Sequence, residues 1–330
     1  MNYKNLLENH VNLEKKYCWL VTGSAGFIGS NLTEALLSLN QKVIGLDDFT
    51  TGKTKNLELA TKNNSQNFRF IKGSINDFQK CEEAVKNVDF VLHHAALISV
   101  PESLEEPVKY HSTNTTGFTN ILEAARKNRI KRVIYASSSA VYGDAPENPK
   151  SEDNLNPENF LSPYALTKYI NEKSAKFYSK IYNLETVGLR YFNIFGPRQD
   201  PSGAYAAVIS KWVDALQSNK VPIIYGDGNA TRDFCAVHNV VLANILAAIT
   251  PGLSGKVFNI GCGIETNLNE LLRIIYRVFA PDKDLNVKYE LPRKGDILKS
   301  SANIELAKKY LNYKPIVMLE DGLKFLKESL

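Results

Sequence analysis

A tyrosine and a lysine four positions apart are the two side chains of this sequence best suited to moving a proton. They lie in SPYALTK (162–168), where Pro163 opens a helical pattern that runs to Tyr182. Residues i and i+4 share one helix face, so Tyr164 and Lys168 would point the same way. A free tyrosine has a pKa near ~10, and a neighbouring ammonium would lower it. The pair is a candidate base, although this spacing also arises by chance on ordinary helix surfaces.

A run of serines ends an apolar stretch upstream of this helix. RVIYASSS (132–139) is typical of a buried strand that closes with Ser137, Ser138 and Ser139. Ligands of parallel sheets bind at the carboxyl ends of the strands, which is where these hydroxyls would lie. Serines are common at strand ends, so their significance depends on whether Tyr164 lies opposite them.

The elements that must position these side chains begin with a strand, a glycine turn and a helix. The pattern predicts a strand over roughly 17–21 and a helix over roughly 27–39. Gly23 would permit the tight turn, Gly26 would let backbone approach a pyrophosphate, and Gly29 would allow close helix–strand packing. The helix N-terminus would then present free N–H groups to the phosphates.

An acidic residue closes the second predicted strand, 43–47. Asp47 lies 18 residues beyond Gly29, at the position where a carboxylate bonds the adenosine ribose and repels a 2′-phosphate. The cofactor predicted by this unit is therefore NAD rather than NADP.

The alternation of strands and helices continues through the first half of the chain. Further strands are predicted over 68–74, 88–96 and 132–139, with helices over 77–87 and 115–128 between them. This order is typical of a Rossmann-like, doubly wound parallel sheet of the α/β class. A smaller α/β domain, interleaved with the first, is expected to bind the substrate. We assign residues 1–190 and about 233–258 to the NAD-binding domain, and residues 191–232 and 259–330 to the substrate-binding domain.

Composition excludes several classes of protein. A net charge of +5 on 330 residues is mild and its lysines are scattered, so no nucleic-acid footprint is visible. The sequence has no run of about 18 apolar residues, which argues against a membrane span. The four cysteines form no disulfide-like framework, and Cys18 and Cys235 lie in apolar runs that suit buried residues. A cytoplasmic protein is expected.

Two adjacent histidines do not predict a metal site. His93 and His94 are neighbours on a predicted strand, so their side chains would point to opposite faces. We therefore expect no metal.

Seven segments together resemble a known family. They are TGSAGFIGS (22–30), HHAALISV (93–100), ASSSAVYG (136–143), SPYALTK (162–168), LRYFNIFGPRQDP (189–201), GDGNATRDF (226–234) and VFNIGCG (257–263). The chain resembles the extended branch of the short-chain dehydrogenase/reductase superfamily. Within that branch it is most similar to the nucleotide-sugar 4-epimerases that act on UDP-N-acetylglucosamine, chiefly through the segment at 190–212.

The resemblance implies a reaction and a set of catalytic residues. Tyr164 would take the proton of the sugar 4-hydroxyl while hydride leaves C4, and Ser138, with Ser139 beside it, would hold that oxygen. Lys168 would bond the nicotinamide ribose and tune Tyr164. Related dehydratases and decarboxylases carry an acid just after the catalytic serine, whereas this chain has Ser139 and Ala140 there. That difference favours epimerisation through a transient 4-keto sugar.

The resemblance also implies binding residues for NAD and for a UDP-sugar. Those for NAD are Gly23, Gly26, Phe27, Ile28, Asp47, Ser74, Ile75, Ala95, Asn114, Tyr164 and Lys168. Those for the substrate are Ser99, Ser138, Ser139, Asn193, Ala207, Val208, Trp212, Arg232, Arg293, Asp296 and Ser300. The two arginines would pair with the diphosphate.

The sugar specificity depends on small residues. Ser300 would leave room for an N-acetyl group, the feature that separates broad from narrow specificity in this family. Three departures from the family pattern bear on the site: Ser74 replaces an adenine-side aspartate, Ile98 replaces a smaller residue, and ILKSSAN (297–303) lacks an Arg-His pair before its serine.

Several alternatives remain open. The enzyme could act on another sugar, such as UDP-glucose/UDP-galactose or a uronic acid, or be a net oxidoreductase or dehydratase. A non-catalytic NAD-binding protein would have lost the Ser/Tyr/Lys set, which is present here. The resemblance also implies a homodimer joined by a four-helix bundle of helices 115–128 and 164–182 from each copy. Both helices carry apolar stripes beyond what one sheet face needs, and core packing is the alternative explanation.

Overall fold

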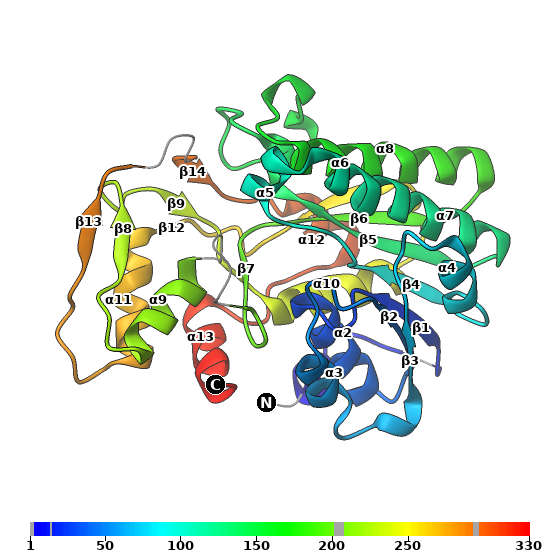
Figure 1. The fold of residues 1–330 in the computed structure, drawn as a ribbon, viewed down its shortest axis with the longest axis horizontal. Coiled ribbons are helices and arrows are strands. Elements are labelled where there is room, and N and C mark those ends of the chain that lie inside the picture. Colours follow the sequence, from blue (N-terminus) through cyan, green and yellow to red (C-terminus); the bar gives the residue numbers. More distant parts are fainter. Residues whose placement is uncertain (1–2, 14, 201–207, 293–296) are drawn as a thin grey trace.

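A seven-stranded parallel sheet forms the centre of the molecule (Figure 1). The computed structural model describes residues 3–13, 15–200, 208–292 and 297–330. The strand order is β11-β6-β5-β4-β1-β2-β3. The strands are β1 (Cys18–Thr22), β2 (Lys42–Asp47), β3 (Phe68–Lys72), β4 (Phe90–His93), β5 (Arg132–Ser138), β6 (Thr186–Tyr191) and β11 (Lys256–Ile260). The predicted doubly wound, Rossmann-like sheet is confirmed, and its order reverses between β1 and β4, where such sheets bind ligands.

Helices cover both faces of this sheet because its strands are apolar on both sides. In β1, Trp19 and Val21 pack into one hydrophobic cluster and Leu20 into another. The first cluster receives α1 (Tyr3–Leu7), α2 (Phe27–Ser38), α10 (Val237–Ile249) and α12 (Glu305–Leu311). The second receives α4 (Phe78–Ala84), α7 (Gly117–Lys127) and α8 (Pro163–Tyr182). A short helix, α3 (Thr54–Thr61), packs against α2.

A smaller group of elements, on the left of Figure 1, has a hydrophobic cluster of its own. Its helices are α9 (Val208–Gln217), α11 (Leu268–Phe279) and α13 (Leu319–Glu328). Short strands join it, namely β8 (Ile223–Tyr225) with β13 (Lys288–Glu290), β9 (Thr231–Arg232) with β12 (Thr266–Asn267) and β14 (Lys299–Ser300), and β7 (Ile194–Phe195) with β10 (Cys235–Ala236). The division into two domains stays a prediction. Packing places α12 against β11 and the large sheet, although we assigned residues 259–330 to the smaller domain.

The helix predicted over 115–128 begins earlier than expected. α5 (Val100–Glu105) is followed by α6 (Pro107–Tyr110), a π-helical segment (His111–Thr116) and then α7. Proline at the first position of α6 suits a helix start, because its missing N–H would be unpaired there in any case. The sequence pattern missed this start because His111–Thr116 is polar.

The expected extra apolar stripe is present on α8 and absent from α7. The large apolar side chains of α7, such as Phe118 and Ile121, are buried, and Thr119 on its outer side is exposed. On α8, Leu166, Phe177 and Ile181 are exposed at roughly helical spacing. The expectation for α7 is therefore wrong, because the large apolar side chains of α7 are all buried against the sheet.

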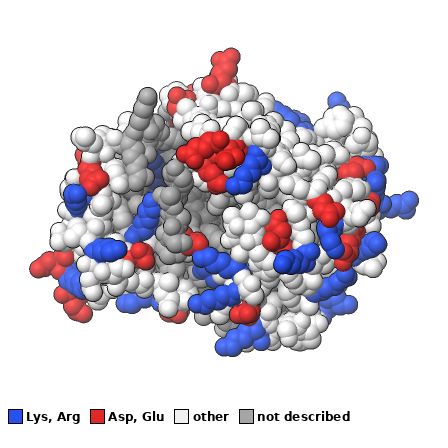
Figure 2. Space-filling view, viewed as in Figure 1, with Lys and Arg blue, Asp and Glu red and all other residues white. Residues whose placement is uncertain are grey.

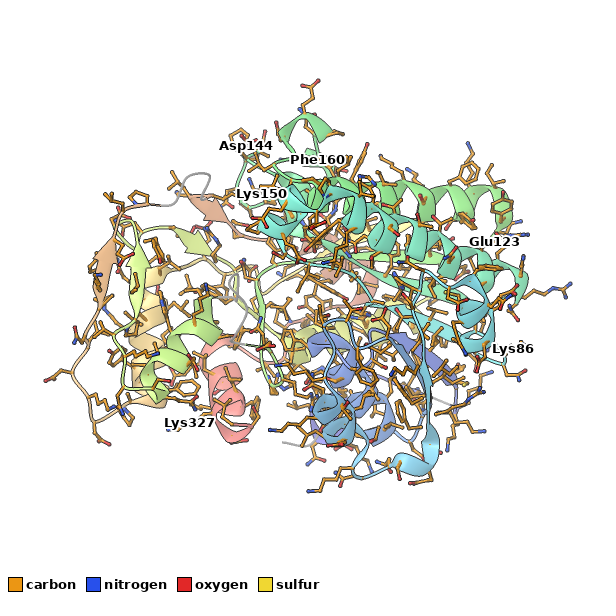
Figure 3. The ribbon with its side chains drawn as sticks, in the orientation of Figure 1. Lys86, Glu123, Asp144, Lys150, Phe160 and Lys327 are labelled. Atoms are coloured by element: carbon orange, nitrogen blue, oxygen red, sulfur yellow. The ribbon has the colours of Figure 1, made fainter. Side chains whose placement is uncertain are left out.

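The segment between β5 and α8 folds back over α8. Asp144 N–H donates to the carbonyl of Asn159 at 3.3 Å, and the Phe160 ring contacts Tyr169 of α8 edge-on. Asp144, Lys150 and Phe160 lie close together in this segment in Figure 3. Gly143 and Lys150 of this segment line the cavity described below.

The adjacent histidines are explained by local bonds. The His93 ring bonds the Thr22 hydroxyl at 2.9 Å, and the His94 ring bonds the Tyr191 hydroxyl at 2.8 Å. No group of three or more metal-ligating side chains occurs among the residues that the structure describes. Burial lowers the pKa of His94 to about 3, so this ring is neutral at physiological pH.

The distribution of surface charge and the burial of two cysteines can be compared with the sequence predictions. On the face seen in Figure 2, acidic and basic side chains are interspersed rather than segregated. Cys235 is fully buried, but Cys18 is only half-buried because it is the first residue of its strand.

Over the described parts of the chain, no helix is both long and apolar enough to span a bilayer. The cytoplasmic location stays a prediction.

Candidate active site

A cavity of about 1350 Å³ runs along the carboxyl ends of the parallel strands, between the large sheet and the smaller group of elements. Residues after β1 to β6 line one wall, and Arg232 and Ser300 line the other. It contains the switch point between β1 and β4, so it is the site that this topology predicts.

The glycine turn after β1 has the shape of a dinucleotide cradle. Gly23 has a φ of +69°, and an added Cβ would lie 2.8 Å from the Ala95 nitrogen. At Gly29 an added Cβ would lie 2.0 Å from the Gly23 carbonyl oxygen, so only glycine lets α2 approach the turn. Gly26 caps α2 without a side-chain bond and lines the cavity with Phe27 and Ile28. The first N–H groups of α2 are thus left for an anion, as NAD diphosphate requires.

Asp47 stands at the adenosine side of this cradle. Its carboxylate accepts from the N–H groups of Ala25 at 2.9 Å and Phe49 at 2.8 Å, and it lines the cavity. Burial raises the pKa of Asp47, and these two backbone bonds oppose that shift. Ser74 and Ile75, which follow β3, also line the cavity.

Two residues assigned to NAD lie near the end of β4 but differ in position. Ala95 lines the cavity, and its N–H donates to Thr22 Oγ1 at 3.1 Å. Asn114 is buried behind the wall, where its amide bonds both the N–H and the carbonyl of Leu97 at 2.8 and 2.9 Å. Asn114 therefore holds the backbone that lines the cavity rather than lining it.

The three candidate catalytic side chains meet on one wall of the cavity. Tyr164 and Lys168 are both buried on α8, and the Lys168 ammonium lies 5.8 Å from the centre of the Tyr164 ring. Lys168 Nζ donates to the carbonyl of Ala136 on β5 at 2.9 Å. The Tyr164 hydroxyl faces the side chain of Ser138, which ends β5 and acts to lower the pKa of Tyr164. Ser139 lines the cavity beside Ser138.

In the protein by itself, the pKa of Tyr164 is raised, whereas the lowering that we expect from an adjacent ammonium together with the nicotinamide ring concerns the NAD-bound enzyme. Burial raises it above 10.0, and the Ser138 hydrogen bond only partly offsets this shift. Burial also lowers the pKa of Lys168 to about 8. Desolvation disfavours the charged form of each group, so the protein's own residues do not make Tyr164 acidic. The remaining charge that favours phenolate is the positive nicotinamide ring.

The residues assigned to the substrate fall into three groups. Ser99, Asn193, Arg232 and Ser300 line the cavity, and Ser300 pairs with Arg232 across β14 and β9. Val208 and Trp212 of α9 pack in the smaller cluster instead, where the Trp212 indole donates to the Ile223 carbonyl at 3.0 Å. Ala207, Arg293 and Asp296 lie outside the described residues.

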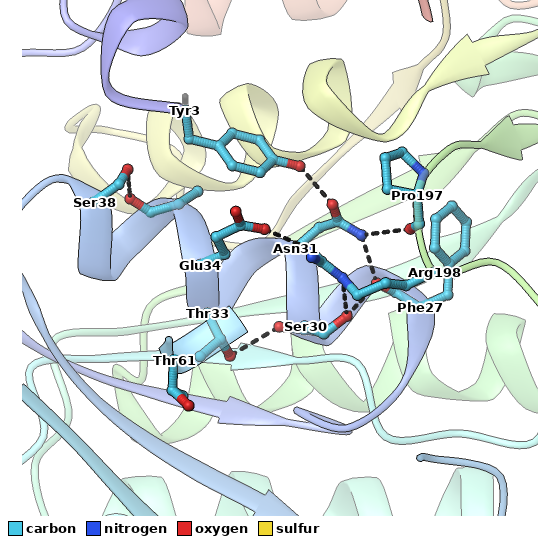
Figure 4. A network of polar contacts seen from close by, with 12 residues as sticks. Tyr3, Phe27, Ser30, Asn31, Thr33, Glu34, Ser38, Thr61, Pro197 and Arg198 are labelled. Carbon is cyan, nitrogen blue, oxygen red and sulfur yellow. Dashed lines mark hydrogen bonds and ion pairs between the residues drawn. The ribbon is translucent and has the colours of Figure 1, made fainter. Parts of the chain in front are cut away.

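Sequence reasoning missed a polar network that ties the cavity wall to α2 (Figure 4). Arg198 lines the cavity, donates to Ser30 Oγ at 2.9 Å and pairs with Glu34 at 2.8 Å. The Asn31 amide donates to the carbonyl of Pro197 at 3.0 Å and accepts from the Tyr3 hydroxyl at 2.6 Å. Arg198 belongs to the motif at 189–201, but no spacing in the sequence relates it to α2.

Two further cations at the cavity were also missed. Lys53 pairs with Asp200 at 2.5 Å, which joins the start of α3 to the loop after β7. Lys150 is buried and donates to the Ala145 carbonyl. Both are single lysines in loops, so nothing in the neighbouring sequence indicates that they lie at the cavity.

Comparisons with known proteins agree with this geometry. The model of the NAD dependent epimerase/dehydratase family matches residues 19–261. The UDP-glucose 4-epimerase of Mycolicibacterium smegmatis is 38% identical over 307 residues, which is 92% of this chain and 95% of that protein.

Solved structures are similar over nearly the whole chain. The UDP-N-acetylglucosamine 4-epimerase from Methanobrevibacter ruminantium, in complex with UDP-N-acetylmuramic acid, is 38% identical with a TM-score of 0.88. The alignment covers 96% of this chain and 98% of that one. The Thermus thermophilus UDP-glucose 4-epimerase complex with NAD is 31% identical with a TM-score of 0.82, over 94% and 98% of the two chains.

The fold and the cradle define an NAD-dependent enzyme of the extended short-chain dehydrogenase/reductase type. The chain belongs to the NAD dependent epimerase/dehydratase family. It is an isomerase of the nucleotide-sugar 4-epimerase type.

Proposed function

We propose that the protein interconverts UDP-N-acetylglucosamine and UDP-N-acetylgalactosamine by inverting C4 through a transient 4-keto sugar. The observation that carries this proposal is the meeting of Ser138, Tyr164 and Lys168 at the wall of a cavity that also contains the dinucleotide cradle. The small side chain of Ser300 on the opposite wall supports an acetamido substrate.

The roles of the catalytic residues follow from their contacts. Tyr164 takes the proton of the sugar 4-hydroxyl and later returns it, and Ser138, which faces the Tyr164 hydroxyl, holds the same sugar oxygen. Lys168, fixed to the Ala136 carbonyl, places a positive charge beside the tyrosine. Bound NAD supplies the acceptor and donor for the C4 hydride. The 4-keto sugar turns over between the two transfers, so the reaction has no net redox change.

Epimerisation is favoured over elimination by the residues beside Ser138. Ser139 and Ala140 follow it, and neither can protonate a leaving group. Elimination of water from a 4-keto sugar requires such an acid. The missing acid therefore supports a reaction in which no group departs.

The diphosphate end of the substrate is assigned to the opposite wall. Arg232 lines the cavity there, and an arginine fork suits phosphate oxygens. Asn193, which follows β6, lines the cavity from the other wall. Ser99 lines the cavity at the N-terminus of α5, on the sugar side of our assignment. Arg293, Asp296 and Ala207 complete the proposed substrate contacts from the sequence.

A second candidate substrate pair is UDP-glucose and UDP-galactose. It is supported by the Mycolicibacterium smegmatis relative, which is a UDP-glucose 4-epimerase. Ile98 at the cavity adds bulk where relatives carry a smaller residue, which also favours the smaller sugar.

The protein is also proposed to form a homodimer through α7 and α8 of each copy. Leu166, Phe177 and Ile181 form an exposed apolar stripe on α8, with 39–52% of each side chain accessible. A second copy would bury this stripe, and the polar outer face of α7 would lie at its rim.

Ser300→Tyr tests the sugar specificity. The larger side chain should lower turnover of UDP-N-acetylglucosamine by about 10-fold or more while sparing UDP-glucose, because one misfitting group costs about 1–3 kcal/mol. Turnover of both sugars is measured with the purified enzyme, and Ser300→Ala, which keeps the site small, is the control. Equal losses on both sugars would contradict the proposed role of Ser300.

A further inference from the structure

A buried ion pair lies directly behind the catalytic wall without lining the cavity. Glu172 on α8 and Arg190 on β6 are 6% and 4% exposed, and Arg190 Nε and Nη2 each donate to Glu172 at 2.8 Å. Neither belongs to the described residues that line the cavity. Their effect on the reaction must therefore be exerted through other residues.

Glu172 is bonded to the catalytic strand as well as to Arg190. The Ser137 hydroxyl donates to Glu172 Oε1 at 2.6 Å, and Ser137 pairs with Arg190 in the register of β5 and β6. Arg190 Nη1 also donates to the Tyr142 hydroxyl at 2.7 Å. One carboxylate thus joins α8 to two neighbouring strands at the residue before Ser138.

The spacing on α8 links this carboxylate to the catalytic pair. Tyr164, Lys168 and Glu172 are at i, i+4 and i+8, so they share one helix face. Their partners on β5 are consecutive: Lys168 bonds the carbonyl of Ala136, Glu172 bonds Ser137, and Tyr164 faces Ser138, which acts to lower its pKa. Three adjacent strand residues therefore hold three successive turns of the helix.

We infer that Glu172 is a positioning residue, which sets the register of α8 on β5 and thereby the contact between the Tyr164 and Ser138 hydroxyls. The inference rests on the proposed function. Buried ion pairs add little stability compared with apolar replacements of similar size, so stability alone does not account for this pair. Burial acts to lower the pKa of Arg190, but its bonds to Glu172 outweigh burial and hold that pKa above its usual range.

The apolar double variant Glu172→Leu/Arg190→Met separates positioning from stability. Removing both charges leaves no unpaired buried ion, so the holoenzyme should fold, retain NAD and unfold near the wild-type midpoint. The link from α8 to Ser137 is lost, and kcat for UDP-N-acetylglucosamine should fall by about 10²-fold, because small misplacements of reacting groups have that effect. KM should change much less than kcat.

The pH profile of kcat gives a readout that a purely structural role would not move. The Ser138 bond lowers the pKa of Tyr164, so weakening it should displace the limb that reports Tyr164 toward higher pH. The matched control is Glu185→Gln, which removes the partner of Arg132 at the opposite ends of the same two strands. This control should lose some stability and keep the wild-type kcat and pH profile.

A second variant keeps the inference testable if the double variant does not fold. Ser137→Ala removes only the hydroxyl that joins Glu172 to β5, and kcat should fall by about 10-fold with the same displacement of the pH limb. If a variant that folds keeps the wild-type kcat and pH profile, the inference about Glu172 is overturned, but the proposed function is not. A wild-type enzyme that turns over no UDP-sugar would instead contradict the proposed function.

Discussion

Tyr164 and Lys168 are both buried, and burial moves their pKa values in opposite directions. It raises that of the tyrosine above 10.0 and lowers that of the lysine to about 8. At neutral pH the protein by itself therefore holds a protonated tyrosine beside a lysine that is still mostly charged. A base formed from Tyr164 needs a further positive charge in the cavity, which the nicotinamide ring of NAD⁺ supplies. The protonation state of Tyr164 thus depends on whether NAD⁺ is bound.

The lowered pKa of Lys168 predicts how stability depends on pH in the NAD-free protein. The unfolded chain binds this proton more tightly than the folded one, since its lysine pKa is near ~10.4. Stability should therefore rise as pH increases from about 8 toward about 10.4, by up to ~1.4 kcal/mol per pH unit from this residue. Lys168→Met should remove that contribution. Urea unfolding of both proteins across this range checks it, and parallel curves for the two would contradict the shift.

The turn after β1 depends on the close contact between Gly23 and Gly29. An added Cβ at Gly29 would lie 2.0 Å from the carbonyl oxygen of Gly23, so α2 would have to move away from the turn. Phe27 and Ile28, whose N–H groups are offered to the diphosphate, lie at the end of α2 that would move.

Gly29→Ala should therefore weaken NAD binding by at least about 10-fold and destabilise the fold by ~1–3 kcal/mol, the usual cost of overpacking. Bound NAD per protein and the thermal midpoint are the measurements. Ser38→Ala, at the far end of the same helix, is the control and should retain NAD. An unchanged NAD content in Gly29→Ala would contradict the close-packing account of this turn.

The elements that sequence could predict are those with strong periodicity. Strands β1 to β5 and helices α2 and α8 lie within a few residues of their predicted ranges, because apolar runs and glycine or proline boundaries mark them. The start of α6 and the π-helical segment after it were missed, since the polar residues there show no hydrophobic periodicity. The strand β11 closes the sheet next to β6, and such long-range pairing leaves no local signal.

The site is built from segments far apart in the sequence. Arg232 and Ser300 become neighbours only because β14 pairs with β9, and Arg198 reaches α2 across the fold. Family resemblance predicted the first two as site residues, but no sequence spacing could relate them. Trp212 and Asn114 show the opposite case: both were assigned to the site, but Trp212 packs in the smaller hydrophobic cluster and Asn114 bonds the backbone of Leu97.

The exposed stripe of α8 predicts the oligomeric state. Phe177→Lys combined with Ile181→Lys places two charges in the proposed interface, which should convert a dimer into a monomer because buried unpaired charges are costly. Light scattering after size-exclusion chromatography measures the mass. Leu59→Lys, at an exposed leucine of α3, is the control and should remain dimeric. A wild-type monomer, or a variant that stays dimeric, would contradict this interface.

We propose that this chain inverts C4 of UDP-N-acetylglucosamine with an NAD that stays bound and is regenerated. The most direct test incubates the purified protein with this sugar, adds no NAD, and follows the configuration at C4 by NMR. We expect the wild type to reach a mixture of the gluco and galacto forms. Tyr164→Phe should fold and retain NAD yet lose about 10²-fold or more of that rate, as expected for removal of a general base. An unchanged sugar with wild-type protein, a deoxy-keto product, or near-normal turnover by Tyr164→Phe would contradict the account.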